Sequence, residues 1–403
     1  MRMTAILTVL FGLALAGCNS ARPANLVCAG FGQTGDTSVP ALRSADTGPI
    51  PAAGPIAAAV DRLLSLRLTD RAGARAGPVV VNYLVMSTGG QYGAFGSGFL
   101  QGWAENTVTP RPQFDVVTGA SAGGVITPFA LAGAAFDDRL ALNAGIGTAD
   151  VLRPRPLIEV LAAPSLMDVS PFEARIKAAI DAPLIAALAA AHAQGRSAFV
   201  GAVNLDTSGF EVVDLTAIAA TDPLAEPCIE AALMATSAIP GLFPPRQING
   251  ALYADAGLRD HVFFAGVEQA LARARAQGVA VELNAWVIIN GDLRAPQTQV
   301  DHNLRALAIR AMSITTDQGL RRSVLELIRL GQETRWTIRA ITAREVDLAG
   351  LCDAPGTAVE SKESALFDPC TTQALFDAGR AYGGAPVIPW MTADELQTLA
   401  RGG

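Results

Sequence analysis

The chain has 403 residues, of which 50% are hydrophobic and 17% are charged, and its formal net charge is −7. That length can bury one large hydrophobic core. A mildly acidic chain without a run of basic residues is a poor candidate for binding nucleic acid, because neutralising phosphates requires clustered Lys and Arg. We therefore expect a globular protein that does not bind nucleic acid.

The N-terminus has the pattern of an export signal. Arg2 precedes an apolar stretch over residues 5–16, which is short for a membrane-spanning helix. Small residues follow, so we expect a signal peptide over residues 1–17. The sequence Leu15-Ala16-Gly17-Cys18 resembles the lipobox of bacterial lipoproteins, which implies lipidation of Cys18 and a membrane anchor. An ordinary secretory signal with an incidental cysteine is the alternative.

Such a lipoprotein is expected in the cell envelope, facing the periplasm. Asn19, in place of an aspartate after the cysteine, favours the outer membrane. The other four cysteines would lie in an oxidising compartment, where they can form disulfides. Three pairings are open, of which Cys352 with Cys370 is the local choice and leaves Cys28 with Cys228. Because no Cys-x-x-Cys is present, neither a zinc site nor a redox motif is indicated.

Residues 18–55 are rich in Pro, Gly, Ser, Thr and Ala, which predicts a tether to a folded body over residues 56–403. In this body, helical patterns alternate with apolar runs. The expected helices cover 56–68, a segment including 99–103, 121–132, 170–193, 230–237, 262–277 and 303–330. The helix over 170–193 is expected to begin with a cap formed by Ser170 and Glu173 and to have a break near Pro183. The expected strands cover 78–86, 114–117, 198–204, 210–215, 251–253, 279–289 and 336–341. The alternation predicts one α/β domain with a mostly parallel central sheet.

Three short segments directly follow expected strands, where open α/β sheets place their sites. They are Ser87-Thr88-Gly89-Gly90-Gln91-Tyr92-Gly93, Gly119-Ala120-Ser121-Ala122-Gly123 and Tyr253-Ala254-Asp255-Ala256-Gly257. The first can direct several backbone N–H groups at one point, as an oxyanion requires. In the second, small neighbours allow a sharp strand-to-helix turn that exposes the Ser121 hydroxyl as a nucleophile. Each segment alone is equally compatible with a plain turn, so the interpretation depends on all three together.

A serine nucleophile needs a base, and the chain has only three histidines: His192, His261 and His302. None of them lies in a glycine-flanked segment after a strand. Asp255 does, and a carboxylate hydrogen-bonded to a serine can take its proton when burial raises its basicity. The residues therefore favour a Ser121–Asp255 dyad over a triad.

In this order, the three segments resemble the patatin-like phospholipases, which share a glycine-rich oxyanion loop, a Gly-x-Ser-x-Gly nucleophile and an Asp-Gly-[Gly/Ala] aspartate. Residues 203–209 are similar to the Thr-Asn-Leu-x-Thr-Gly turn of the family. Residues 235–245, Ala-Thr-Ser-Ala-Ile-Pro-Gly-Leu-Phe-Pro-Pro, are similar to its segment before the aspartate. The resemblance covers about residues 79–260, with an extension to 340. It departs at Thr88, where the family has glycine, and at Tyr92, where it has Lys or Arg.

The resemblance implies a three-layer α/β/α sandwich and a serine lipid acyl hydrolase that uses no metal or organic cofactor. Ser121 would attack the ester carbonyl, and Asp255 would act as general base and then as acid. The N–H groups of Gly89 and Gly90 would hold the oxyanion. The implied substrate is a membrane phospholipid or another lipid ester. Head group, acyl length, positional specificity and oligomeric state are not indicated.

Three alternatives stay open. A Ser–Asp–His triad would use His261 or His302 as the base. A membrane-anchored protein that kept the scaffold could bind lipid or a partner without turnover, which would account for the altered glycine loop. An acyltransferase would form the same acyl-enzyme and pass the acyl group to an acceptor other than water.

Overall fold

The computed structural model describes residues 25–31, 54–70, 77–160, 163–294, 299–352 and 366–402. The expected signal peptide, Cys18 and most of the tether lie outside these residues. The predicted domain boundaries therefore stay predictions.

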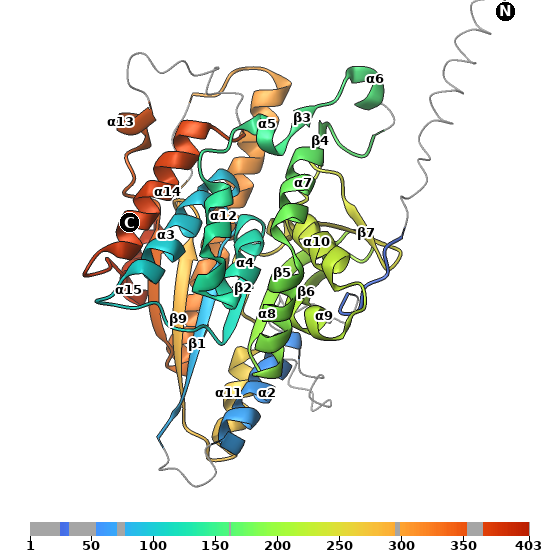
Figure 1. Cartoon of the computed structure of the whole chain (residues 1–403). Coiled ribbons are helices and arrows are strands. Elements are labelled where there is room, and N and C mark those ends of the chain that lie inside the picture. The colour runs from blue at the N-terminus through green and yellow to red at the C-terminus, as the bar shows by residue number, and fades with distance from the viewer. Residues whose placement is uncertain are drawn as a thin grey trace, which may run out of the picture.

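One large sheet and its covering helices make up the molecule (Figure 1). The strands of the large sheet are β1 (Val79–Met86), β2 (Val116–Gly119), β5 (Ser197–Asn204), β6 (Phe210–Asp214), β7 (Arg246–Ile248), β8 (Ala251–Asp255), β9 (Val281–Ile289) and β10 (Thr337–Thr342). Strands β3 (Arg153–Pro154) and β4 (Met167–Asp168) form a separate antiparallel pair. The α-helices are α2 (Pro55–Asp70), α3 (Gly93–Glu105), α4 (Ala122–Ala132), α5 (Thr148–Val151), α6 (Leu157–Val160), α7 (Ser170–Ala179), α8 (Ala182–Ala193), α9 (Leu215–Thr221), α10 (Ala225–Thr236), α11 (Val267–Ala276), α12 (Leu304–Thr334), α13 (Leu348–Cys352), α14 (Pro369–Gly384) and α15 (Ala393–Arg401). Three 3₁₀ segments are η1 (Gly90–Tyr92), η2 (Ala134–Asn143) and η3 (Ala256–Leu258).

The sheet is mostly parallel. Its order is β10-β9-β1-β2-β5-β8-β7, with β6 also paired to β5. Strands β10, β9, β1, β2 and β5 run parallel, whereas β6, β8 and β7 pair in antiparallel fashion. This arrangement confirms the predicted α/β fold with a mostly parallel central sheet.

Both faces of the sheet are buried, as the continuous apolar run of β1 predicts. Successive side chains of a strand point to opposite faces. Leu84 and Met86 accordingly belong to one core, together with residues of α3, α4, α8, α10 and α14. Tyr83 and Val85 belong to a second core, together with residues of α2, α11, α12 and α15. The molecule is therefore a three-layer sandwich, with the sheet between two groups of helices.

Strands β2 and β8 meet end to end beside β5. Val200 pairs with Gly119 of β2, and Ala202 pairs with Asp255 of β8. The other edge of this part of β5 is taken by β6. Because β2 is parallel and β8 antiparallel to β5, their carboxyl ends face each other. The register thus brings the turn after Gly119 close to Asp255.

Helices α3 and α14 approach each other so closely that their glycines are required. A Cβ on Gly98 or Gly102 of α3 would stand 2.0 Å from a carbonyl oxygen of α14. A Cβ on Gly379 or Gly383 of α14 would stand 2.2 Å from a carbonyl oxygen of α3. Since α3 follows the glycine-rich loop directly, this packing connects α14 to that loop.

Gly379→Ala should destabilise the protein, because its new methyl group would overlap the Phe95 carbonyl oxygen at 2.2 Å. Overpacking of this kind costs about 1–3 kcal/mol. Gly384→Ala is a matched control in the same helix, because its Cβ would make an ordinary contact at 3.7 Å. Chemical unfolding should show a lower free energy of unfolding for Gly379→Ala alone. Equal stabilities for the two variants would contradict the close packing.

The four cysteines form the two disulfides that the sequence favoured. Cys352 is joined to Cys370, and Cys28 is joined to Cys228 across 200 residues of sequence. Leu26 forms a parallel bridge with Ile248, next to the second disulfide in sequence. The segment over residues 25–31 is thereby fixed to the folded body.

Several boundaries differ from the sequence-based expectations. The helix expected from residue 230 begins at Ala225, and the one expected from 262 begins only at Val267, after Gly266 with a φ of 103°. The predicted cap of the helix at residue 170 was wrong. The Ser170 hydroxyl donates to Asp168 at 2.8 Å, and Glu173 accepts from Arg246 at 2.9 Å instead of reaching back. Tertiary partners outcompeted the local capping pattern in this case.

No single helix among the described residues is both long and apolar enough to cross a membrane. Helices α7 and α8 pass that test only as a pair, with a bend of 63° between them.

Candidate active site

Ser121 stands at the sharp turn between β2 and α4. Its backbone φ is 51° and its ψ is −121°, which is a strained conformation for a residue other than glycine. The glycines beside it supply the space. A Cβ on Gly119 would stand 2.2 Å from Thr127 Oγ1, and one on Gly123 would stand 2.5 Å from the Ser87 carbonyl oxygen. The turn therefore has the backbone strain and small neighbours of a nucleophile elbow, with the positive end of α4 beside the hydroxyl.

Asp255 ends β8 and is only 6% exposed. Its Oδ1 accepts a 2.7 Å hydrogen bond from the Gly257 amide, while Oδ2 has no partner at full hydrogen-bond geometry among the described residues. Burial raises the pKa of Asp255 to about 6, although interactions with the Ser121 hydroxyl and the Gly257 amide both lower it. The Ser121 hydroxyl therefore lies close enough to the Asp255 carboxyl to lower its pKa, although it forms no hydrogen bond to Oδ2. A carboxyl with this pKa can accept a proton near neutral pH.

Residues 235–245 connect the serine turn with the aspartate. The buried Thr236 hydroxyl oxygen accepts a 3.1 Å hydrogen bond from the Ser121 amide. Two residues later, the Ala238 carbonyl accepts a 2.9 Å bond from the Asp255 amide. One segment thus fixes both backbones. The sequence pattern identified this segment but assigned no role to Thr236, whose hydrogen bond depends on the tertiary structure.

The glycine-rich loop lies against the serine turn. A Cβ on Gly93 would stand 2.8 Å from Ala122 Cβ, directly after Ser121. Gly90 has a φ of 54°, and a Cβ on Gly89 would stand 2.2 Å from the Asn290 carbonyl oxygen. In the described part of the chain, no acceptor takes the amide hydrogens of Gly89 or Gly90. These two N–H groups are therefore available to a ligand beside the turn.

Asn290, which follows β9, holds the start of this loop. Its amide donates to Ser87 Oγ at 2.9 Å, and its Nδ2 donates to the Ser87 carbonyl at 2.8 Å. The Ser87 hydroxyl in turn donates to the Thr88 carbonyl at 2.6 Å. The sequence did not single out Asn290 because it is about 200 residues from the loop in the chain.

The three histidines lie in different environments. His192 contacts Arg62, and His302 is exposed before α12. His261 is buried, with Nδ1 2.7 Å from Thr88 Oγ1, and burial lowers its pKa to about 4. Among the described residues, no histidine hydrogen-bonds to Asp255. The contact that a triad requires between aspartate and histidine is therefore not formed in this arrangement.

Tyr92, which stands where the family pattern has a basic residue, is partly buried. Burial raises the pKa of Tyr92, and the Asp292 carboxylate raises it further. The side chain is consequently a neutral phenol over the physiological pH range. This side of the loop therefore presents a neutral polar group where the family pattern places a positive charge.

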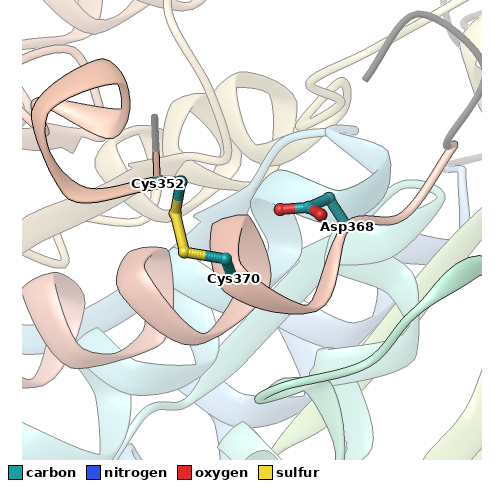
Figure 2. A group of neighbouring side chains, drawn as sticks. All are labelled: Cys352, Asp368 and Cys370. Carbon is teal, nitrogen blue, oxygen red and sulfur yellow. A yellow bond between two sulfur atoms is a disulfide. The ribbon is translucent and has the colours of Figure 1, made fainter. Parts of the chain in front are cut away.

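One group of potential metal ligands lies outside this site. Figure 2 shows Cys352, Asp368 and Cys370 near one another. The two sulfurs are bonded to each other, so they are not thiolate ligands. The Asp368 carboxylate caps α14 by accepting a 2.8 Å hydrogen bond from the Thr371 amide. The donor set fits a disulfide and a helix cap rather than a metal centre.

The fold and the site together define an α/β protein. A strained serine, a buried carboxyl and a glycine-rich loop lie at the carboxyl ends of its strands. Residues 84–267 match the family described as patatin-like phospholipase. Over these residues the chain is similar to the patatin-like phospholipases, a family of lipid acyl hydrolases.

Solved structures also show similarity to this chain. The crystal structure of VipD from Legionella pneumophila is 13% identical, with a TM-score of 0.31, and the match covers 75% of this chain and 68% of that one. None of the curated proteins compared with the chain matches it.

Proposed function

We propose that this protein hydrolyses lipid carboxylic esters through an acyl-enzyme, with Ser121 as the nucleophile and Asp255 as the general base. The observation that supports this proposal most directly is the pairing of a serine at φ 51° with a buried carboxyl whose pKa is raised to about 6. The strained turn presents the hydroxyl, and the carboxyl is basic enough to accept its proton.

In the first half of the reaction, Asp255 takes the Ser121 proton while Oγ attacks the ester carbonyl. The negative charge that develops on the carbonyl oxygen is stabilised by the amides of Gly89 and Gly90. The protonated Asp255 then gives its proton to the leaving alcohol, and the acyl group stays on Ser121. In the second half, water attacks this ester while Asp255 takes a proton from it, and the carbon–Oγ bond then breaks as Asp255 gives that proton to Ser121 Oγ. The fatty acid leaves, and the Ser121 hydroxyl and the Asp255 carboxylate are both restored.

The lipid class also has a physical argument. Tyr92 and Asp292 give this side of the glycine loop a neutral phenol and a carboxylate, where the family pattern has a cation. Because Tyr92 is neutral, it offers no positive charge to attract the phosphate of a lipid head group. We therefore expect zwitterionic or uncharged lipid esters to be better substrates than anionic phospholipids.

The purified mature chain tests this function. Wild-type protein should hydrolyse p-nitrophenyl esters, react with a fluorophosphonate probe, and release fatty acid faster from phosphatidylcholine vesicles than from phosphatidylglycerol vesicles. His302→Ala, at an exposed position, should match the wild type in all three assays. A folded wild type that neither reacts nor hydrolyses would favour the non-catalytic binding protein. Loss of activity in His302→Ala would favour the triad.

The membrane anchor is a separate proposal that rests on the Leu-Ala-Gly-Cys pattern before residue 19. We propose that lipidation of Cys18 attaches the protein to the cell envelope, with the outer membrane as its site. Cys18→Ser should therefore shift the protein from the membrane to the soluble fraction when cells are fractionated, with hydrolysis per molecule unchanged. Retention of Cys18→Ser in the membrane fraction would contradict this anchor.

A further inference from the structure

Thr88 and His261 are in contact at two points, one through side chains and one through the backbone. The Thr88 hydroxyl oxygen lies 2.7 Å from His261 Nδ1, and the Thr88 amide donates to the His261 carbonyl at 3.1 Å. Both side chains are buried, at 5% and 3% exposure respectively. Thr88 directly precedes Gly89, so this contact reaches the backbone that carries the proposed oxyanion donors.

The imidazole of His261 also lies beside the aspartate turn. A Cβ on Gly257 would stand 3.0 Å from Asp255 Oδ1 and 3.1 Å from His261 Cε1. Gly257 donates the 2.7 Å hydrogen bond to Asp255, so the ring lies beside the residue that orients the carboxyl. The ring is therefore located between the glycine loop and the general base.

Helix α12 fixes His261 from behind. A Cβ on Gly319 would stand 2.5 Å from His261 Nε2, so no larger residue fits there without movement. Ser323 Oγ accepts a 3.2 Å hydrogen bond from the His261 amide and donates to Asp260 Oδ1 at 2.5 Å. Both the ring and the backbone of His261 are thus held by a helix that lies outside the matched residues 84–267.

We propose that the Thr88–His261 hydrogen bond sets the distance between the oxyanion donors and the general base, which makes His261 a positioning residue for hydrolysis. This inference rests on the proposed function. It gives a specific role to the departure from the family pattern, since a glycine at position 88 would have no hydroxyl to reach the imidazole. It also separates His261 from a triad, because Nδ1 is engaged by Thr88 and Nε2 faces α12.

The ionisation of His261 is compatible with this role. Burial lowers its pKa to about 4, so the ring is neutral over the range in which Asp255 is ionised. A neutral imidazole can accept from, or donate to, the threonine hydroxyl without placing a charge beside the carboxylate. Either tautomer preserves the bond.

The test separates positioning from folding by kinetics. Thr88→Val keeps the shape and removes the hydroxyl, and it should lower kcat by roughly 10–100-fold with KM within about twofold, because small displacements of reacting groups cost rates of this order. Thr88→Ser should restore most of kcat. His261→Asn, which keeps a polar atom near the Nδ1 position, should retain more activity than His261→Leu.

A double-mutant cycle gives the decisive readout. If Thr88 and His261 act through one bond, Thr88→Val combined with His261→Leu should lose no more than the worse single variant. The melting temperature of each variant is measured alongside, with His302→Ala as the exposed control. A purely structural role would lower the melting temperature and leave kcat of the folded fraction unchanged, which would overturn the inference.

Two failures can be told apart. An inert, folded wild type would overturn the proposed function and this inference with it. An active wild type whose Thr88→Val variant has the same kcat, or whose two single losses simply multiply in the double variant, would overturn this inference alone.

Discussion

Ser121→Ala should abolish fluorophosphonate labelling and reduce ester hydrolysis by about 10⁴–10⁶-fold, the range found when a catalytic serine is removed. Removing the Ser121 hydroxyl removes the oxygen on which the proposed acyl ester forms. Asp255 could still activate a water molecule, and the Gly89 and Gly90 amides could still bind the oxyanion, so a small residual rate over the uncatalysed reaction is expected. The loss should lie in kcat rather than in substrate binding.

A second variant separates chemistry from stability at this position. Ser121 has a φ of 51°, a conformation that glycine adopts without the strain of a side chain. Ser121→Gly should therefore be as inactive as Ser121→Ala and at least as stable as the wild type in thermal unfolding. If Ser121→Gly is inactive and more stable than the wild type, the backbone at Ser121 is strained in the native protein. Substantial hydrolysis by both variants would show that Ser121 is not the nucleophile.

The parts of this site that could be predicted from sequence are those set by local backbone demands. The glycines around Ser121 and the pair Gly89-Gly90 occur because neighbouring backbone leaves no space for a Cβ or because φ is positive, and both requirements leave a pattern of small residues. The continuous apolar run of β1 likewise predicts a strand buried on both faces. Local sequence is sufficient where the constraint itself is local.

The remaining parts depend on contacts between distant segments. The meeting of β2 and β8 follows from the registers of both strands on β5, which no short pattern encodes. His261 resembled a helix-start residue, yet the segment before Val267 is irregular and places the ring beside Thr88. The sequence did not single out the glycines of α3 and α14, because only the structure shows that these two helices pack against each other.

Asp255→Asn should lower kcat by about 10²–10⁴-fold, the range for loss of a general base. The wild type should also lose kcat/KM as the pH falls through about 6, because protonation of Asp255 removes the base. The amide does not titrate, so the small residual rate of Asp255→Asn should lack this acidic limb. Asp138→Asn, at an exposed position in η2, serves as the control and should keep both the rate and the limb. A limb that persists unchanged in Asp255→Asn would assign it to another group.

Asp255→Asn, which should lower kcat, should raise the stability of the folded protein at neutral pH. Burial raises the pKa of Asp255 from its ordinary value of 3.8 to about 6 in the folded protein, so between these values the folded chain holds a proton that the unfolded chain releases. The contribution of this group to stability is thus greatest below about pH 4, falls as the pH rises, and is lowest above about 6. Asp255→Asn removes that cost, so it should unfold at a higher temperature than the wild type at pH 7.5, with the difference shrinking towards pH 4. A variant that is both inactive and more stable only at neutral pH would show that the fold tolerates a buried charge because catalysis requires it. Equal destabilisation at both pH values would instead mean that Asp255 is held by favourable contacts and not poised as a base.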